Sequence, residues 1–212
     1  MPLKFDKPYA IIVGHPRSGT HLLESCLACH PKVHKRSECV LRYKQLDGKT
    51  KLSAELRKKT PFINHPGYVN LAIVMYAELP LLEQLCGPLA GFKIIHLLRD
   101  PLAVARSYAQ WEANKALHGK KARAHYKTAE TPLPNAPVPE KSLRTLANKV
   151  KKLQTEHAEI LASHPATLTV HYEDFTQNEQ VAELPADFAD EILKFIGLRP
   201  HRLACDLRKT GS

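Results

Sequence analysis

The feature of the sequence that most constrains the fold is the stretch from Ala10 to Leu27, where an apolar run breaks into a glycine- and proline-containing turn and then resumes. The first part, Ala10 to Val13, is continuously apolar, which is typical of a strand buried on both faces of a parallel sheet. After the turn, apolar residues recur from Leu22 to Leu27 at the spacing of one helical face. The stretch therefore predicts a strand, a loop and a helix in direct succession.

The loop has the glycine spacing of a phosphate-binding Walker-A motif, with Gly14 and Gly19 at its two ends. The rest of that motif is missing, because Thr20 stands where the lysine belongs and His21 where the Mg²⁺-ligating hydroxyl belongs. The cation lies inside the loop, as Arg17. Such a loop suits an anionic 5′ group of a nucleotide and argues against a metal-bridged γ-phosphate. An ordinary turn that needs glycine for a positive φ is the simpler alternative.

Two segments carry a resemblance to a known family. Gly14 to Thr20, Gly-His-Pro-Arg-Ser-Gly-Thr, resembles the 5′-phosphosulfate loop of sulfotransferases that use 3′-phosphoadenosine-5′-phosphosulfate (PAPS), whose usual form is G-x-P-[KR]-S-G-T. Phe92 to Pro101, followed by Ser107, resembles the family's 3′-phosphate segment, a strand that ends in R-[DN]-P with a serine further along. Two motifs in the family's order make the resemblance specific.

The resemblance implies which residues hold the donor nucleotide. Arg99 follows its strand at the sheet edge where open α/β folds bind ligands, so its guanidinium and the Ser107 hydroxyl can converge on the 3′-phosphate. A local pairing of Arg99 with Asp100 is the alternative. Tyr172 to Phe175 resembles the family's Y-E-D-[LFM] segment, although a structural role for the tyrosine is an equal alternative, and the tail from Leu207 resembles its basic R-K-x-G segment. The donor-binding residues implied in this way are Arg17, Ser18, Gly19, Thr20, His21, Arg99, Ser107, Tyr172, Arg208 and Lys209.

Catalysis needs a group that accepts the proton of the attacking hydroxyl, and Glu38 is the first candidate. The resemblance to tyrosylprotein and carbohydrate sulfotransferases extends from the loop to Glu38, where several members have a proposed acidic base. A surface glutamate paired with a neighbouring arginine is the alternative. Glu78 and His34 are the other candidate bases. Arg17 and the loop amides would stabilise charge on the leaving phosphate, with Lys93 a candidate second cation.

Composition limits the partners without choosing one. The chain of 212 residues carries a formal net charge of +10, which calls for a nucleotide, a nucleic acid, an acidic glycan or a membrane surface. Aromatic residues make up only 7% of the chain and no nucleic-acid-binding motif is recognisable, so we expect no nucleic acid. No apolar run is long enough to span a bilayer, and we expect no membrane partner.

The N-terminus predicts a cytoplasmic protein, and the cysteine count predicts free thiols. Met1 to Lys7 lacks the apolar region of a secretory signal. The five cysteines are an odd number and are expected to be free thiols. Cys26 and Cys29 have metal-ligand spacing, but no second pair accompanies them, and we expect core packing and no metal site.

The rest of the sequence supplies the remaining elements. Apolar spacing from Tyr68 to Cys86 predicts a helix that Pro80 interrupts. The proline-rich segment from Thr128 to Pro139 predicts an extended loop or lid. The other expected elements are a strand around Val33, a strand over Phe92–Leu98, a helix that begins at Asp100-Pro101, a helix over Leu143–Leu161, a strand over Thr167–Tyr172 and a helix over Phe188–Ile196.

These observations predict one α/β domain over residues 1–212, a three-layer sandwich with a central parallel sheet of four or five strands, related to nucleotide kinases. The resemblance implies a PAPS-dependent sulfotransferase that needs no metal and releases adenosine 3′,5′-bisphosphate. Its acceptor would be a small molecule or glycan, an anionic one included, with a hydroxyl or amine. A P-loop kinase and a basic nucleic-acid-binding protein are the alternatives. The sequence predicts neither the acceptor nor the oligomeric state.

Overall fold

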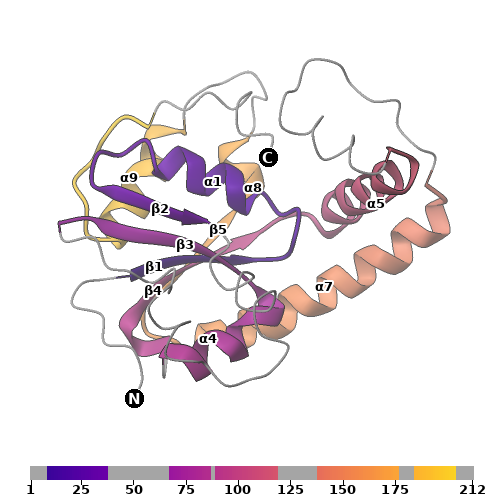
Figure 1. The fold of residues 1–212 in the computed structure, drawn as a ribbon, viewed down its shortest axis with the longest axis horizontal. Helices are drawn as coiled ribbons and strands as arrows, with labels where there is room; N and C mark the ends of the chain where they lie inside the picture. Colours follow the sequence, from indigo (N-terminus) through magenta and orange to yellow (C-terminus); the bar gives the residue numbers. More distant parts are fainter. Residues whose placement is uncertain (1–8, 38–66, 87–88, 119–137, 177–183, 204–212) are drawn as a thin grey trace.

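The fold is built around a parallel sheet of five strands in the order β2-β3-β1-β4-β5 (Figure 1). A computed structural model describes residues 9–37, 67–86, 89–118, 138–176 and 184–203. The expected α/β class and the central parallel sheet are confirmed. The strands are β1 (Tyr9–Gly14), β2 (Val33–Ser37), β3 (Val69–Met75), β4 (Phe92–Leu98) and β5 (Thr167–His171).

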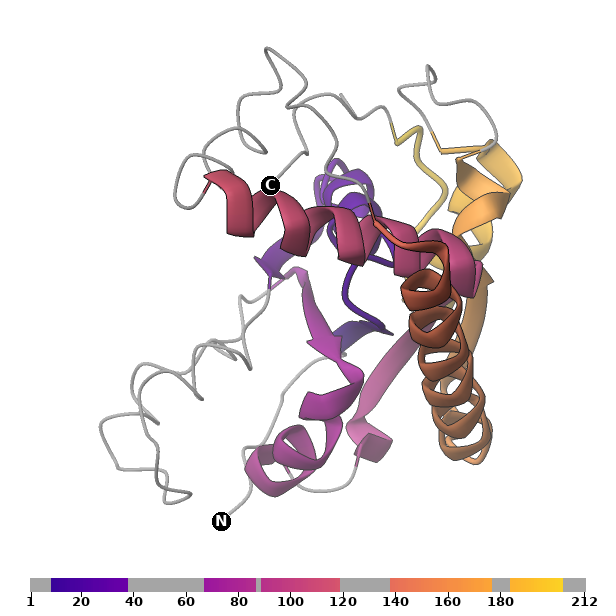
Figure 2. The same cartoon turned by 90° about the vertical axis from the view of Figure 1, so that its right-hand side faces the viewer.

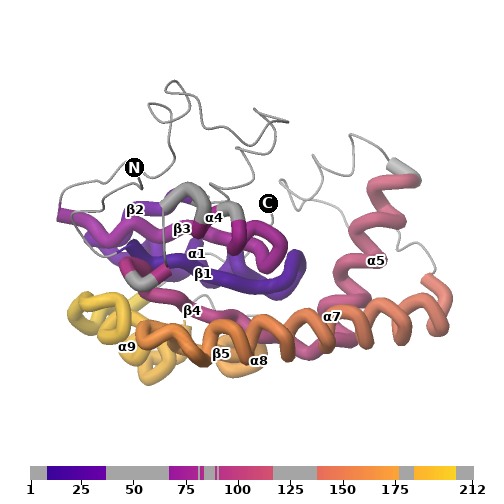
Figure 3. Tube along the Cα trace, turned by 90° about the horizontal axis from the view of Figure 1, so that it is seen from below, coloured from indigo at the N-terminus to yellow at the C-terminus, as the bar shows by residue number. Residues whose placement is uncertain are grey.

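Helices lie on both faces of this sheet. One core packs α1, α8 and α9 against it, and the other packs α4 and α7, so the described chain forms three layers (Figures 1 and 3). Figure 2 shows α5 leaving the edge of the sheet and meeting α7 at an angle. The helices are α1 (Thr20–Leu27), η1 (Tyr76–Glu78), α4 (Leu79–Cys86), η2 (Leu89–Gly91), α5 (Pro101–His118), α7 (Glu140–Ala162), α8 (Tyr172–Phe175) and α9 (Ala186–Phe195).

Strand β1 is the centre of the sheet, and all its residues are buried. Ile11 and Val13 point into the core beneath α4 and α7, whereas Ala10 and Ile12 point into the core beneath α1 and α9. Because a strand alternates its side chains, a strand covered on both faces must be apolar at every position. The predicted buried strand is therefore confirmed. Because β1 is the central strand, the loop that follows it lies at the middle of the carboxyl edge of the sheet.

The predicted helix over Tyr68–Cys86 is wrong in its first half. Val69–Met75 forms β3, which lies between β1 and β2 and is buried along its whole length. Periodicity does not separate a short buried strand from a buried helix, and the β-branched Val69, Ile73 and Val74 favour the strand. The helical part of the range is the short 3-10 helix η1 (Tyr76–Glu78) followed by α4 (Leu79–Cys86), with Pro80 in the first turn of α4, where its missing N–H costs nothing.

The cysteine expectation is wrong at one position. Cys26 is fully buried, as expected, but it is disulfide-bonded and is not a free thiol. Cys29 is free and exposed, as predicted. An odd number of cysteines requires one unpaired thiol and leaves the others able to pair, so the count alone could not exclude this bond.

The strand order brings both sequence motifs to one edge. β1 and β4 are neighbours with Gly14 opposite Leu97, so the loop after β1 and Arg99 after β4 emerge side by side. The chain leaves β1 toward β2 and leaves β4 toward β5, and the carboxyl ends of strands at such a reversal form the usual ligand crevice of open α/β sheets. Among the described helices, none is both long and apolar enough to cross a bilayer.

Candidate donor-binding site

The loop between β1 and α1 is a tight turn closed on its own backbone. The buried Ser18 makes two hydrogen bonds to the His15 carbonyl, from its N–H at 3.1 Å and from its Oγ at 2.7 Å. Arg17 has a φ of 71° and Gly19 a φ of 96°, both in the left-handed region. An arginine there is uncommon, and backbone strain of this kind is often found at ligand sites.

Both loop glycines are required by close neighbours. A Cβ on Gly14 would lie 2.7 Å from Ser18 Oγ and 3.1 Å from the Leu97 carbonyl. A Cβ on Gly19 would overlap the ring of Tyr172, which comes from α8. The glycines therefore let the backbone fold closely against β4 and α8, in addition to providing a positive φ at Gly19.

Arg99 connects the second motif to the loop. Its Nη1 donates to the Arg17 carbonyl at 2.9 Å, and its guanidinium carbon lies 4.0 Å from the ring centroid of Tyr172. The Arg99 Nε is buried without a partner in the described structure. On the other side of the loop, Arg17 Nε donates to Ser107 Oγ at 3.3 Å, from the second turn of α5. The structure thus brings together Arg17, Arg99, Ser107 and Tyr172.

Two residues that the sequence analysis did not assign hold Arg99 in place. Gln154, in the middle of α7, donates from Nε2 to the Arg99 carbonyl at 2.9 Å. Glu173 accepts the Asp100 N–H at 2.9 Å. Asp100 accepts the Ala103 N–H at 2.7 Å and so caps the first turn of α5, and it does not form the local pair with Arg99 that was the alternative. No sequence signal pointed to Gln154, because its contact joins elements far apart in the chain.

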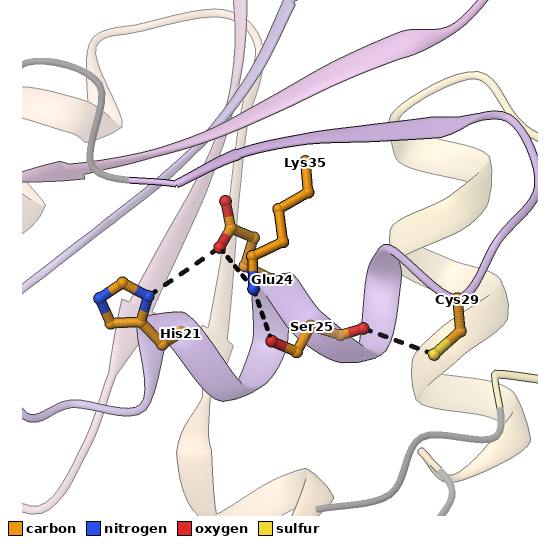
Figure 4. Close-up of polar contacts among 5 residues, drawn as sticks. All are labelled: His21, Glu24, Ser25, Cys29 and Lys35. Atoms are coloured by element: carbon orange, nitrogen blue, oxygen red, sulfur yellow. Dashed lines mark hydrogen bonds and ion pairs between the residues drawn. The ribbon is translucent and has the colours of Figure 1, made fainter. Parts of the chain in front are cut away.

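Helix α1 begins directly after the loop, and ionisable side chains cluster beside its first two turns. Thr20 is buried, and the side chain of His21 is 33% exposed. Glu24, one turn further, is fully buried, with its Oε2 3.9 Å from His21 Nδ1 and 3.3 Å from Lys35 Nζ (Figure 4). Lys35 lies on β2 and also donates to Ser25 Oγ at 2.9 Å. Backbone N–H groups at such a helix start bind anions.

A second polar cluster is formed by His96 of β4 and Tyr76 of η1. His96 is 1% exposed, and its Nε2 is 2.8 Å from the hydroxyl of Tyr76, on whose ring His157 stacks. Burial, with smaller contributions from His157 and His171, lowers the pKa of His96 to about 4, so the imidazole is neutral near pH 7. Burial also raises the pKa of Tyr76. Two neutral groups that satisfy each other's hydrogen bonding can be buried at little cost.

The remaining assigned residues divide into those outside the described ranges and those with other contacts. Glu38, Arg208 and Lys209 lie outside the described residues. Glu78 is 2% exposed and accepts the Met75 N–H at 2.9 Å. Lys93 lies toward the amino end of β4 and donates to the Phe195 carbonyl, so it is not beside the loop.

The candidate base His34 lies on β2, where its Nε2 is 3.3 Å from Arg36 Nη1. His15, inside the loop, bonds through Nδ1 to the Pro16 carbonyl at 2.7 Å. Burial lowers the pKa of His15, with this hydrogen bond acting in the opposite direction. Near pH 7 His15 is therefore a neutral part of the turn and supplies no charge to an anion.

Comparisons with known proteins show what the sequence and the fold of this chain resemble. Residues 8–78 match the model of the sulfotransferase family. Among solved structures, a sulfotransferase from Alicyclobacillus acidocaldarius is 13% identical, with a TM-score of 0.57 over 96% of this chain and 85% of the other. The sulfotransferase domain from the curacin biosynthetic pathway is 19% identical, with a TM-score of 0.57 over 93% of this chain and 75% of the other. Mouse sulfotransferase SULT7A1, complexed with PAP, is 16% identical, with a TM-score of 0.51 over 98% of this chain and 65% of the other.

A comparison with curated protein sequences finds no significant match. The structural matches show a shared fold, an α/β protein with helices on both faces of a parallel sheet. The family model covers the strand, the loop and the first helix. Together these two findings confirm the predicted resemblance to the sulfotransferase family.

Proposed function

We propose that this chain transfers a sulfuryl group from PAPS to a hydroxyl or amine. The observation that carries the proposal is the junction of the two motifs, where Arg17 contacts Ser107 at 3.3 Å and Arg99 holds the Arg17 carbonyl at 2.9 Å. A nucleotide with phosphates on both the 3′ and the 5′ positions of its ribose would meet both cations at one sheet edge. The family model over residues 8–78 and the PAP complex of a protein with this fold support the same ligand.

The chemistry assigned to this site is an in-line displacement at sulfur. The acceptor oxygen or nitrogen forms a new bond to sulfur, the bond between sulfur and the bridging oxygen breaks, and its electron pair leaves with the 5′-phosphate. The acceptor proton passes to a base. We assign Arg17 and the N–H groups at the start of α1 to the charge that develops on the leaving phosphate, because fixed donors of this kind stabilise such transition states.

We assign the base to Glu38. It follows Ser37, the last residue of β2, and the carboxyl ends of parallel strands lie at the ligand edge of the sheet. Glu78 is a less suitable base, because its buried carboxylate already accepts the Met75 N–H. Glu38→Gln should lower kcat by about 10² to 10⁴ with little change in donor binding. Near wild-type turnover in this variant, with loss of activity in Glu78→Gln or His34→Ala, would move the base to one of those residues.

Thermal melting with nucleotides tests the donor assignment. Adenosine 3′,5′-bisphosphate at about 100 times its Kd should add roughly 2.7 kcal/mol of stability, and it should do so in the presence of a chelator. Adenosine 5′-monophosphate should stabilise much less, because it lacks the group that Arg99 and Ser107 are assigned to bind. Equal shifts from both nucleotides would contradict the assignment of the 3′-phosphate. Strict dependence of turnover on Mg²⁺, or transfer of the γ-phosphate of ATP, would favour the kinase alternative.

The acceptor we propose is a small molecule or a glycan, with anionic glycans included because the chain carries a net charge of +10. Sulfate transfer to a panel of neutral phenols, neutral sugars and uronic acids tests this, and exclusive activity on neutral phenols would exclude glycans, the anionic ones among them, as acceptors. We also propose a cytoplasmic location. The disulfide at Cys26 is unusual for that compartment, so the redox state of Cys26 in cells tests the proposed location. A fully oxidised Cys26 in cells would contradict it.

A further inference from the structure

A line of ring side chains runs from the phosphate loop along α5. The imidazole of His15, inside the loop, meets the ring of Tyr108 with the two centroids 6.4 Å apart. The centroid of Tyr108 lies 6.0 Å from that of Trp111, and the Lys115 ammonium lies 4.8 Å from the centroid of Trp111. Tyr108, Trp111 and Lys115 are three and four residues apart, so they share one face of α5.

The packing of the fold does not account for these rings. Among the described residues, the buried members of the two cores that cover the sheet include neither Tyr108 nor Trp111, and both side chains are half-buried. Helix α5 extends beyond the edge of the sheet and does not lie flat on either face (Figure 2). Rigid aromatic side chains outside a core supply a large contact area at a low cost in conformational entropy, which is typical of binding surfaces.

The line begins at the loop that is assigned to the 5′-phosphosulfate. Tyr108 directly follows Ser107, whose Oγ accepts the Arg17 Nε–H at 3.3 Å. His15 is fixed by its bond from Nδ1 to the Pro16 carbonyl at 2.7 Å, and burial lowers its pKa, so it is an uncharged ring near pH 7. A ligand on these rings would therefore have one end at the loop and would extend away from it along α5.

Several rings in a row suit a ligand that is itself made of rings joined end to end. A sugar ring presents an apolar face of C–H groups, which packs on an aromatic ring, while its hydroxyls stay in water or meet polar groups. A single phenol would use only one ring of the line. Lys115, at the outer end, has Glu112 Oε1 at 3.8 Å, which balances part of its charge. The surface therefore selects by ring stacking more than by charge.

We propose that His15, Tyr108 and Trp111 form an acceptor platform, on which the sugar rings of a glycan chain stack so that one hydroxyl faces the 5′-phosphosulfate. The proposal rests on the proposed function and narrows its acceptor from a small molecule or glycan to a glycan chain. One sugar lies beside His15, and the following sugars lie on Tyr108 and Trp111. Its consequence is that acceptor affinity rises with the number of sugars until the platform is filled.

Tryptophan fluorescence tests the platform directly, because Trp111 is the only tryptophan of the chain. The protein is titrated with the monosaccharide, disaccharide and trisaccharide of galacturonic acid, and with the neutral cello-oligosaccharides of the same lengths. Emission should change in at least one series, and affinity should rise about tenfold from the monosaccharide to the trisaccharide. Equal affinity at all lengths, no response in either series, or a response to phenol alone would overturn the proposal.

Tyr108→Ala shows whether stacking is the cause. This variant should bind the trisaccharide about threefold to tenfold more weakly, and it should raise KM for that acceptor more than it lowers kcat. Tyr68→Ala is the control for binding, because Tyr68 is 41% exposed and directly precedes β3, away from α5. Equal weakening in the two variants would overturn the proposal. If Tyr108→Ala does not fold, Tyr108→Leu keeps an apolar side chain without the ring, and the same loss is expected.

Titration with adenosine 3′,5′-bisphosphate separates the platform from the donor site. Tyr108→Ala should keep the wild-type affinity for the bisphosphate, and a parallel loss would mean that Tyr108 only supports the loop, which would overturn the proposal. If the wild-type protein binds the bisphosphate but no oligosaccharide, the platform fails and the proposed function stands. If it binds oligosaccharides at Trp111 but no bisphosphate, the proposed function fails and the platform loses its role as an acceptor site.

Discussion

The two halves of the candidate donor site are held in different ways. The 5′ loop is fixed mostly by its own chain, through the two bonds from Ser18 to His15 and the left-handed turn at Gly19. Arg99, assigned to the 3′-phosphate, is fixed by elements that come much later, through Gln154 of α7 and Tyr172 of α8. A local turn tolerates changes elsewhere in the molecule, whereas Arg99 depends on how the rest of the fold packs.

The largest expected effect is that of Arg99→Ala. The variant loses the guanidinium that is assigned to the 3′-phosphate. It also loses the hydrogen bond to the Arg17 carbonyl, so both halves of the site are affected. We expect bisphosphate affinity to fall about 10³-fold, or roughly 4 kcal/mol. Calorimetry measures this affinity, with Arg106→Ala as the control, because Arg106 is an exposed arginine of α5. A loss of less than about tenfold would mean that Arg99 does not bind the 3′-phosphate.

Gly19→Ala should be the next most damaging. The alanine would have to adopt a φ of 96° and would also overlap the Tyr172 ring, so we expect a loss of about 3 kcal/mol of stability. Gly67→Ala is the matched control, because Gly67 has a φ of 86° but no atom within 4 Å of its Cβ position. Its cost should be about 1 kcal/mol, the backbone strain alone. Denaturant unfolding measures both free energies of unfolding. Similar losses in the two variants would show that overlap with the Tyr172 ring adds nothing to the cost at Gly19.

Acid should lower the free energy of unfolding through His96, which lies on β4, the strand that leads to Arg99. The pKa of His96 is about 4 in the folded chain, below the ordinary value of 6.5, so between these values the unfolded chain binds the extra proton. Stability from this group is therefore complete above about pH 6.5 and lost as pH falls toward 4, by about 2 kcal/mol. Urea unfolding at pH 7 and pH 4.5 measures it. His96→Gln keeps a partner for Tyr76 without titrating and should lose less, and an equal acid loss in both proteins would contradict the assignment.

The smallest expected effect is that of Gln154→Leu. It leaves the Arg99 side chain intact and removes only the hydrogen bond to the Arg99 carbonyl, so bisphosphate affinity should fall about threefold to tenfold. Thr155→Val, at the exposed neighbouring position of α7, is the control. Unchanged affinity in Gln154→Leu would show that α8 alone is sufficient to place Arg99.

The contrast between the two halves also explains what the sequence could predict. Each motif is a continuous segment of the sequence, and the resemblance of both motifs to the sulfotransferase family led to the prediction that Arg17 and Arg99 belong to one site. The structure places the ends of β1 and β4, which lead to these two residues, side by side. Gln154 carried no signal, because its role depends on α7 crossing the end of β4. The pair of Tyr76 and His96 was equally invisible, since a histidine within an apolar strand has no readable partner in the sequence.

The errors have the same physical origin. Val69–Met75 was assigned to a helix because an apolar run does not reveal how many of its faces are covered, and its place between two strands makes it β3. Cys26 was expected to be a free thiol because a cysteine count does not say which thiols the fold brings together. Both were decided by tertiary packing.

The contact between Tyr172 and Gly19 determines when the site can exist during synthesis. The loop, its strand and its helix are complete early in the chain, but the ring that closes the loop and stacks on Arg99 is made only after β5. Domains acquire native structure as their last long-range contacts form, and such contacts form slowly. A ribosome-bound chain that stops before β5 would thus carry both arginines yet lack the wall between them. The proposed nucleotide binding would in this sense be a late event in the synthesis of the chain, and it would report that folding has reached residue 172.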